Sequence, residues 1–244
     1  MKKRLICLAH RGASGHAPEN TLAAFEKAVA LGADWIELDV YAAGRELVVI
    51  HDNRLERTTN GSGYVTRRSL TYLRRLDAGN GEKIPFLREV LDAAARRIKI
   101  NIELKGPDTA EPVCRLIRHY VRDRGWRYDD FLLSSFTHGQ IRRAKALCPS
   151  VRIAPNLNGG RLRYGGWDGP TAPYSVHLDK KYATRTLIDK IHDRGCPAFV
   201  FTVNDQAEIK KLAAMGADGI FTNYPELITE KAPAGEVTRP PDRT

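Results

Sequence analysis

The chain alternates strand-length apolar runs with helix-length amphipathic segments over most of its length. Runs such as "ICLAH" and "AFVFTV" are nearly continuous hydrophobes, which is typical of strands covered on both faces of a parallel sheet. Eight such runs occur: Leu5–His10, Trp35–Val40, Lys99–Leu104, Phe131–Phe136, Val151–Leu157, Tyr174–Leu178, Ala198–Val203 and Gly219–Thr222. This alternation predicts an α/β fold, because parallel neighbours need a helical crossover between them.

The helical segments carry start and stop signals of their own. Asn20 or Thr21 is placed to cap the helix that begins near Leu22, and Gly32 stands just past its end. The phrase "ALGADWIE" at 30–37 returns as "AMGADGIF" at 214–221, so helix, glycine and strand repeat as a unit. Eight such units predict a closed (β/α)8 TIM barrel. No GxGxxG motif follows the first strand, which argues against an open nucleotide-binding sheet.

Two segments interrupt the repeat. Leu47–His51 reads as an extra strand, and the turn-rich residues 52–85 then precede a helix over Phe86–Arg97. We therefore expect a small insertion over about 41–85, after the second barrel strand. Residues 158–173 are rich in glycine where a helix is expected. That segment fits either a mobile loop that closes on substrate or a surface loop that replaces a dispensable helix.

Length and composition favour a single domain. The chain has 244 residues, the usual size of an α/β barrel, and we expect one domain over 1–232 and a Pro-rich, disordered tail over 233–244. A fold of this size needs neither disulfides nor a metal for stability. The four cysteines stand far apart with no CxxC pair, so we expect them to be reduced and buried rather than bound to zinc.

Charge and hydropathy narrow the choice of partners. The chain has 39 Lys and Arg against 29 Asp and Glu, a net charge of +10, which attracts anions. The arginines spread over the helical segments without the aromatic-interleaved stripe of nucleic-acid binders, so no nucleic-acid partner is predicted. No apolar run of about 20 residues occurs, and the N-terminal run is too short for a signal peptide. We therefore expect no transmembrane segment and a cytoplasmic location.

Acidic residues stand near the ends of the second and third predicted strands. Because side chains alternate along a strand, Glu37 and Asp39 point to one side, as do Glu103 and Lys105. The carboxyl ends of barrel strands form the active site. Three carboxylates that converge there repel one another unless a cation neutralises them, and oxygen ligands suit Mg²⁺ or Ca²⁺. We therefore predict that Glu37, Asp39 and Glu103 bind one divalent cation.

Two histidines and two permanent cations accompany these carboxylates. His10 and Arg11 end the first strand, and His51 ends the extra strand. A metal ion flanked by Arg11 and Lys105 favours an anionic substrate, above all a phosphate. His10 and His51 are predicted to exchange protons with its attacking and leaving oxygens. The remaining histidines are expected to be structural or surface residues, with His16 left open because it is near the site in sequence: His16, His119, His138, His177 and His192.

Six sequence blocks resemble the glycerophosphodiester phosphodiesterase family, in that family's order and across almost the whole chain. They are "HRGASGHAPENTLAAF", "GADWIELDV", "VVIHDNRLERTTNGSG", "NIELK", "FTVN" and "DGIFTNYP". The resemblance implies a TIM barrel with an insertion after strand two. It also implies metal-dependent hydrolysis of glycerophosphodiesters to glycerol 3-phosphate and an alcohol, in which the neighbouring glycerol hydroxyl attacks first and water then opens a cyclic phosphate.

The resemblance implies the same residue roles, with some departures from the family. The implied metal ligands are Glu37, Asp39 and Glu103, the acid/base pair is His10 and His51, and the phosphate-binding cations are Arg11 and Lys105. Asn223 stands where the family usually has aspartate, and Phe201 stands where it usually has tryptophan. The stretch "YAAGRELVV" lacks an acidic residue often found before its glycine. No catalytic group is lost, and Phe201 is expected either to line the glycerol end of the pocket or to pack in the core.

Two other functions stay open beside this one. A lysophospholipase D-like phosphodiesterase would need an apolar groove at the barrel mouth, and residues 158–173 contain no apolar run. A non-catalytic, basic anion-binding barrel is the third reading, against which the seven chemically competent site residues argue. In both enzyme readings the predicted partner is a small-molecule phosphodiester, and the sequence predicts neither its alcohol nor the oligomeric state.

Overall fold

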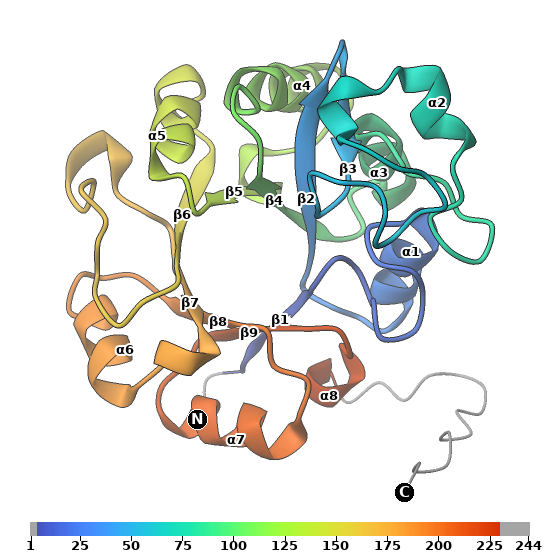
Figure 1. The fold of residues 1–244 in the computed structure, drawn as a ribbon. Helices are drawn as coiled ribbons and strands as arrows, with labels where there is room; N and C mark the ends of the chain where they lie inside the picture. Colours follow the sequence, from blue (N-terminus) through green and yellow to red (C-terminus); the bar gives the residue numbers. More distant parts are fainter. Residues whose placement is uncertain (1–3, 230–244) are drawn as a thin grey trace, which may run out of the picture.

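The computed structural model describes residues 4–229, so the predicted tail over 233–244 lies outside the described residues. Its barrel strands are β1 (Ile6–Ala9), β2 (Trp35–Ala43), β4 (Lys99–Leu104), β5 (Phe131–Ser135), β6 (Arg152–Leu157), β7 (Val176–Asp179), β8 (Ala198–Phe201) and β9 (Gly219–Thr222). Neighbouring strands in this order pair in parallel, and β1 also pairs with β9 (Figure 1). The ring is therefore closed, which confirms the predicted (β/α)8 TIM barrel.

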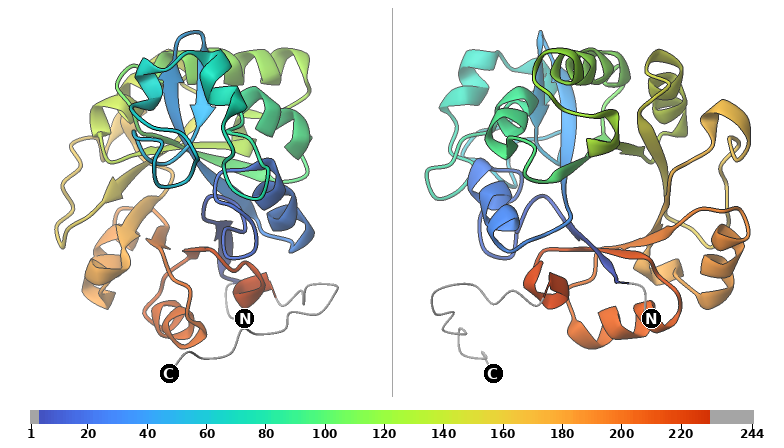
Figure 2. Two further views of the ribbon diagram at one scale, coloured as in Figure 1. Left: turned by 45° about the vertical axis from the view of Figure 1, so that its right-hand side comes forward. Right: turned by 180° about the vertical axis from the view of Figure 1, so that it is seen from behind.

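The α-helices lie outside the ring of strands (Figure 2). They are α1 (Leu22–Ala30), α2 (Leu70–Arg75), α3 (Leu87–Ala94), α4 (Ala110–Asp123), α5 (His138–Leu147), α6 (Arg185–His192), α7 (Gln206–Ala214) and α8 (Glu226–Thr229). Short 3-10 turns are η1 (Val65–Arg67), η2 (Tyr128–Asp130), η3 (Gly169–Thr171) and η4 (Lys180–Tyr182). Between β6 and β7 the described chain contains only η3, so the glycine-rich segment does replace a helix.

Local backbone chemistry sets the helix ends. Thr21, rather than Asn20, caps α1, and its hydroxyl accepts a hydrogen bond from the N–H of Ala24 at 3.3 Å. The helix predicted over Phe86–Arg97 is shorter at its end, because Ala95 and Arg96 adopt left-handed conformations with φ of 46° and 62°. A left-handed residue stops the helical hydrogen-bond ladder.

Apolar side chains pack both outside and inside the ring. The larger clusters lie between strands and helices and include the buried residues Ile100, Ile117 and Ile188. A smaller cluster joins six strands through Leu8, Trp35, Leu132, Ala154, Phe199 and Phe221. Because these six side chains come from β1, β2, β5, β6, β8 and β9 and contact one another, they fill the interior of the ring, as expected for a barrel.

The segment between β2 and α3 adds a strand outside the ring. β3 (Glu46–Val49) pairs antiparallel with β2, with Val49 opposite Val40. Leu47 and Val49 of β3 pack into a main barrel cluster. The rest of the segment packs with the end of β2 in a third cluster, which consists of Tyr41, Ala43, Val48, Ile50, Leu55, Val65, Leu73, Leu76, Ala78, Ile84 and Phe86. The N–H of Ile50 bonds to the carbonyl of Asp39 at 3.0 Å, which brings the end of β3 to the barrel mouth. Among residues 4–229, no helix has the length and apolarity needed to cross a membrane.

We predict that Gly12→Ala destabilises the fold by about 2–3 kcal/mol. Gly12 has a φ of +79°, and a β-carbon there would lie 2.7 Å from the carbonyl carbon of Ala24. Gly44 is a matched control, because its φ is +58° but a β-carbon would meet nothing within 4 Å; Gly44→Ala should cost only about 1 kcal/mol. Urea unfolding followed by circular dichroism measures both, and an equal loss of stability would contradict the steric argument.

Candidate active site

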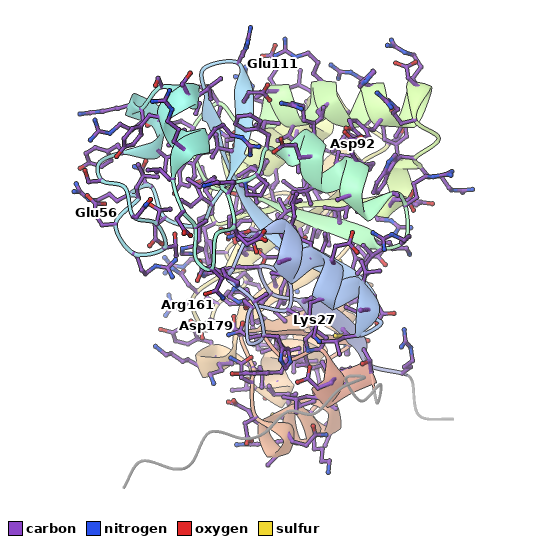
Figure 3. All side chains as sticks on the ribbon, turned by 90° about the vertical axis from the view of Figure 1, so that its right-hand side faces the viewer. Lys27, Glu56, Asp92, Glu111, Arg161 and Asp179 are labelled. Atoms are coloured by element: carbon purple, nitrogen blue, oxygen red, sulfur yellow. The ribbon has the colours of Figure 1, made fainter. Side chains whose placement is uncertain are left out.

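One cavity of about 160 Å³ lies at the carboxyl ends of the barrel strands. All eight site residues predicted from the sequence line it: His10, Arg11, Glu37, Asp39, His51, Glu103, Lys105 and Phe201. Figure 3 shows Glu56, on the segment after β3, and Arg161, after β6, on the same side of the molecule as Asp179, the last residue of β7. Those two segments therefore flank the mouth. The structure brings the predicted residues together, and their individual roles stay predictions.

Three carboxylates meet within this cavity. Oxygen atoms of Glu37, Asp39 and Glu103 all lie within 4.8 Å of one another, and Asp39 is 1% exposed. Burial, followed by repulsion from Asp39, raises the pKa of Glu37 and raises the pKa of Glu103 to about 7. Burial alone would also raise the pKa of Asp39, but the charges of Lys105, His51 and Arg11 outweigh it and lower that pKa. Three ionised carboxylates in this buried cluster would therefore be unfavourable without a cation to neutralise them.

Two cations offset part of that charge. The backbone N–H of Arg11 donates to Glu37 at 2.9 Å, and the Arg11 Nε lies 3.6 Å from Asp39. The ammonium of Lys105 lies 3.0 Å from Glu103 and 3.6 Å from Asp39. Both side chains also border the open volume of the cavity. A phosphate that entered would therefore meet two positive charges beside the carboxylates.

The three carboxylates fit a divalent cation. One buried oxygen of Asp39, Oδ1, accepts no hydrogen bond from any described residue, although buried polar atoms are normally satisfied. Glu37, Asp39 and Glu103 offer only oxygen atoms, which are the preferred ligands of Mg²⁺ and Ca²⁺. A cation bound among them would satisfy the orphan oxygen and relieve the mutual repulsion.

His51 belongs to a chain of charged side chains at the mouth. Asp52 accepts a hydrogen bond from its Nδ1 at 2.5 Å, and Asp52 in turn accepts one from Arg57 at 2.5 Å. Arg57 also donates twice to Glu19, at 2.8 Å each. The other ring nitrogen, Nε2, lies 3.2 Å from the ammonium of Lys105. Burial, with help from Arg11 and Lys105, lowers the pKa of His51 although Asp39 and Asp52 oppose the change.

His10 has a neutral partner instead of a carboxylate. Its Nδ1 donates to the amide oxygen of Asn223 at 2.9 Å, and the N–H of Asn223 is held by Asn204 at 2.8 Å. Burial, followed by the charge of Arg11, lowers the pKa of His10 to about 4. With the hydrogen on Nδ1, its Nε2 has a free lone pair at neutral pH.

Several polar side chains that line the cavity, which we call the amide floor, were not predicted from the sequence. Asn101 donates to the hydroxyl of Ser134 at 3.2 Å, while its Oδ1 is buried and accepts no hydrogen bond from the described residues. His177 also lines the cavity, but Asn156 and Ser175 satisfy its ring nitrogens and burial lowers its pKa to about 3. These contacts hold the His177 ring in the wall of the cavity, and its structural role stays a prediction. The sequence could have predicted Asn101 as a cavity residue, because it stands two residues before Glu103 and therefore lies on the same face of the strand.

The other four histidines do not line this cavity. His138 lies next to it, and its Nε2 is 3.1 Å from the carbonyl oxygen of Asn156. His16, which the sequence left open, pairs with Glu226 at 2.8 Å, and His192 pairs with Asp218 at 2.8 Å. His119 pairs with Asp123 on the surface of α4. These contacts agree with structural or surface roles.

Comparisons with known proteins agree on one family. The model of the glycerophosphoryl diester phosphodiesterase family matches residues 10–227. The chain is 40% identical to YhdW of Bacillus subtilis over 238 residues, which cover 92% of this chain and 96% of that protein. It is 33% identical to a glycerophosphodiester phosphodiesterase of Caldanaerobacter subterraneus over 239 residues, with coverage of 92% and 96%.

A solved structure gives the same result for the fold. The chain resembles a phosphodiesterase of Oleispira antarctica in complex with the product sn-glycerol-3-phosphate, with a TM-score of 0.84 and 30% identity over 92% of this chain and 95% of that one. The chain belongs to the glycerophosphoryl diester phosphodiesterase family. This confirms the resemblance drawn from the six sequence blocks and, with it, the prediction of an enzyme.

We predict that Mg²⁺ or Ca²⁺ raises the melting temperature more at about pH 8 than at about pH 5. The pKa of Glu103 in the folded, metal-free chain is about 7, above its ordinary value of 4.5. Its proton therefore stabilises the fold below about pH 4.5, and this contribution, about 1–3 kcal/mol, is lost as the pH rises through 7. A cation binds the ionised carboxylates, so its effect grows over the same range. Thermal unfolding with and without each ion measures the difference.

The control for this measurement separates the cluster from the protein surface. Glu103→Gln should remove the ion-dependent rise and raise the metal-free melting temperature at about pH 8, since one repelling charge is gone. Glu111→Gln, exposed on α4 (Figure 3), should change neither quantity. An ion effect that survives Glu103→Gln would show that the ion binds elsewhere.

Proposed function

We propose that this chain hydrolyses glycerophosphodiesters to glycerol 3-phosphate and an alcohol, using a divalent cation and two histidines. The observation that carries the proposal is the meeting of three buried carboxylates and two differently partnered histidines in one cavity. Membership of the family supports glycerophosphodiesters as the substrate class. The product named in the Oleispira complex, sn-glycerol-3-phosphate, supports the same class.

Glu37, Asp39 and Glu103 would hold the cation. When bound, Mg²⁺ or Ca²⁺ supplies neutralisation of the phosphate and of the charge that develops on its oxygens in the transition state. Arg11 and Lys105 would bind the non-bridging phosphate oxygens, because both border the cavity and carry permanent charge. Ion pairs of Arg11 with Asp39 and of Lys105 with Asp39 and Glu103 hold the two side chains in place before substrate arrives.

His10 is suited to remove a proton. Asn223 fixes its hydrogen on Nδ1, and the low pKa of about 4 keeps Nε2 unprotonated at neutral pH. We assign His10 to the glycerol hydroxyl next to the phosphate. As that oxygen attacks phosphorus, its proton passes to His10 Nε2, and the bond from phosphorus to the alcohol oxygen breaks to leave a cyclic phosphate.

His51 is suited to give a proton to the departing alcohol. Asp52 accepts from Nδ1 at 2.5 Å, which orients the ring and offsets part of the effect by which burial, Arg11 and Lys105 lower the pKa of His51. The two histidines then exchange roles as water opens the cyclic phosphate, since the second step reverses the direction of both proton transfers. Each transfer of this kind contributes roughly 10²–10⁴-fold.

The glycerol end would lie against an aromatic and amide surface. Phe201 lines the cavity and packs edge-on against Phe136 and Phe221, so both of its predicted roles, pocket wall and packing, are compatible. The unpartnered Oδ1 of Asn101 is a ready acceptor for a glycerol hydroxyl. A lysophospholipid would instead need a continuous apolar groove for its acyl chain, and beyond Phe136 the only other apolar side chain among the described residues that lines the space is Leu157, beside glycines, asparagines, a histidine and two arginines.

Glycerol 3-phosphate release tests the proposed function directly. We expect turnover of glycerophosphodiesters that disappears with EDTA and returns with Mg²⁺ or Ca²⁺, because the carboxylates repel one another and the phosphate until a cation binds. The assay uses glycerophosphoglycerol, glycerophosphoethanolamine and glycerophosphocholine, with lysophosphatidylcholine as the control substrate. Faster turnover of the lysophospholipid, or ion-independent turnover, would contradict the proposal.

We predict that His10→Ala and His51→Ala each lower kcat by at least about 10²-fold, because each removes a proton-transfer group. His119→Ala is the matched control, since His119 is exposed on α4 and pairs with Asp123. Circular dichroism verifies that each variant folds. Turnover close to that of the unmodified chain in either variant would exclude that histidine from the reaction.

A further inference from the structure

A second hollow of about 580 Å³ adjoins the catalytic cavity. We call it the loop groove, and it is lined by Phe136, His138, Asn156, Leu157, Asn158, Gly159, Gly160, Arg161 and Arg163. Phe136 and Asn156 line both the loop groove and the catalytic cavity. A substrate that extends past Phe136 therefore passes from the reacting centre directly into this groove.

The charge of the loop groove has one sign. Its lining contains no aspartate or glutamate, but it contains Arg161 and Arg163. Both arginines are exposed, and no carboxylate within residues 4–229 lies within ion-pair distance of either guanidinium. Arg57, on the other side of the mouth, shows the contrast, because Glu19 and Asp52 pair with it. The groove therefore presents positive charge that the described part of the chain does not neutralise.

The loop that carries these arginines is anchored to the core. Leu162 and Trp167 pack against the apolar cluster around β7 and β8. Tyr164 is 4% exposed, and its hydroxyl donates to the carbonyl of Thr171 at 2.7 Å. Arg161 and Arg163 alternate with these anchoring residues, so the two guanidinium groups start from backbone held against the barrel.

The two hollows differ in what they are suited to bind. The catalytic cavity holds the carboxylates, the histidines and the amide floor, which suit the phosphate and glycerol that all substrates of the proposed reaction share. The loop groove is wider, and β-carbons at Gly159 and Gly160 would meet nothing within 4 Å. Glycerol bound at Asn101, which is 1% exposed, would occupy the buried end of the catalytic cavity. The leaving alcohol, which is the variable part of the substrate, would then point to the mouth, where Phe136 is 42% exposed and the groove begins.

We infer that the preferred substrate is a glycerophosphodiester whose leaving alcohol carries a negative charge, a carboxylate or a second phosphate, held by Arg161 and Arg163. This inference rests on the proposed function and specifies its substrate class. A cationic alcohol gains a contact with the exposed ring of Phe136, but it meets the repulsion of two unpaired arginines. A neutral alcohol gains neither attraction nor repulsion from them.

Two matched pairs of substrates test the charge preference. Glycerophosphoserine differs from glycerophosphoethanolamine by one carboxylate, and glycerophosphoglycerol 3′-phosphate differs from glycerophosphoglycerol by one phosphate. At low ionic strength we expect kcat/KM to be about fivefold higher for the anionic member of at least one pair, through KM, and the advantage to shrink with added KCl. The pair with the larger ratio identifies the anionic group.

Variants of the loop connect this preference to the two arginines. Arg161→Ala with Arg163→Ala should remove the preference and leave the neutral glycerophosphoglycerol within about twofold, whereas lysine at both positions should retain it. Arg45→Ala is the matched control, because Arg45 is exposed on the turn between β2 and β3, across the ring from β6 (Figure 1).

The outcomes separate this inference from the proposed function. Equal kcat/KM within both pairs, or a preference that survives loss of both arginines, overturns the anionic alcohol while the hydrolysis stands. Absence of turnover for every diester with either cation overturns the proposed function, and the inference with it.

Discussion

Three carboxylates are forced together by the register of two neighbouring strands. β2 and β4 pair so that Asp39 stands beside Glu103 and Glu37 beside Asn101, and the alternation of side chains turns all of them toward the cavity. The surrounding structure responds to this charge. Arg11 takes a left-handed backbone conformation with φ of 57° and donates its N–H to Glu37, and Asn20 donates its amide to Asp39 at 3.0 Å. The site is thus organised around repulsion that protein groups offset only in part.

Much of this arrangement follows from sequence periodicity. The barrel and the convergence of Glu37, Asp39 and Glu103 depend on two regularities: side chains alternate along each strand, and parallel strands run in one direction. Both can be read from the sequence of each of the eight strand-and-helix units. The partners of the histidines depend on other information. His10 and Asn223 are 213 positions apart, and their contact requires β1 and β9 to close the ring at the correct register. The ion-pair network of Asp52, Arg57 and Glu19 likewise depends on how an irregular segment folds over the mouth, and no sequence periodicity specifies that fold.

The barrel strands and the loop between β6 and β7 supply different parts of the site. Strand ends supply the carboxylates and the amide floor, so their positions are fixed by the sheet. The loop between β6 and β7 supplies the arginines, and the absence of an α-helix there leaves room for the loop groove. Of the two interpretations of the glycine-rich segment, a surface loop in place of a helix describes the structure, and closure over substrate stays a prediction. Loops of this kind change more freely than strands, which lets one scaffold serve different alcohols.

His51 stands apart from the other reacting groups because it follows β3, a strand that lies outside the ring. Leu47 and Val49 anchor β3 in the barrel core, but the segment from Ile50 to Phe86 packs in another apolar cluster, whereas the carboxylates lie on strands of the closed barrel. Cooperative units with separate cores open with separate free energies. On heating, the outer segment is therefore able to open while the barrel remains intact. Inactivation then precedes global unfolding, and a chain that has lost its proton donor still retains the complete cation site.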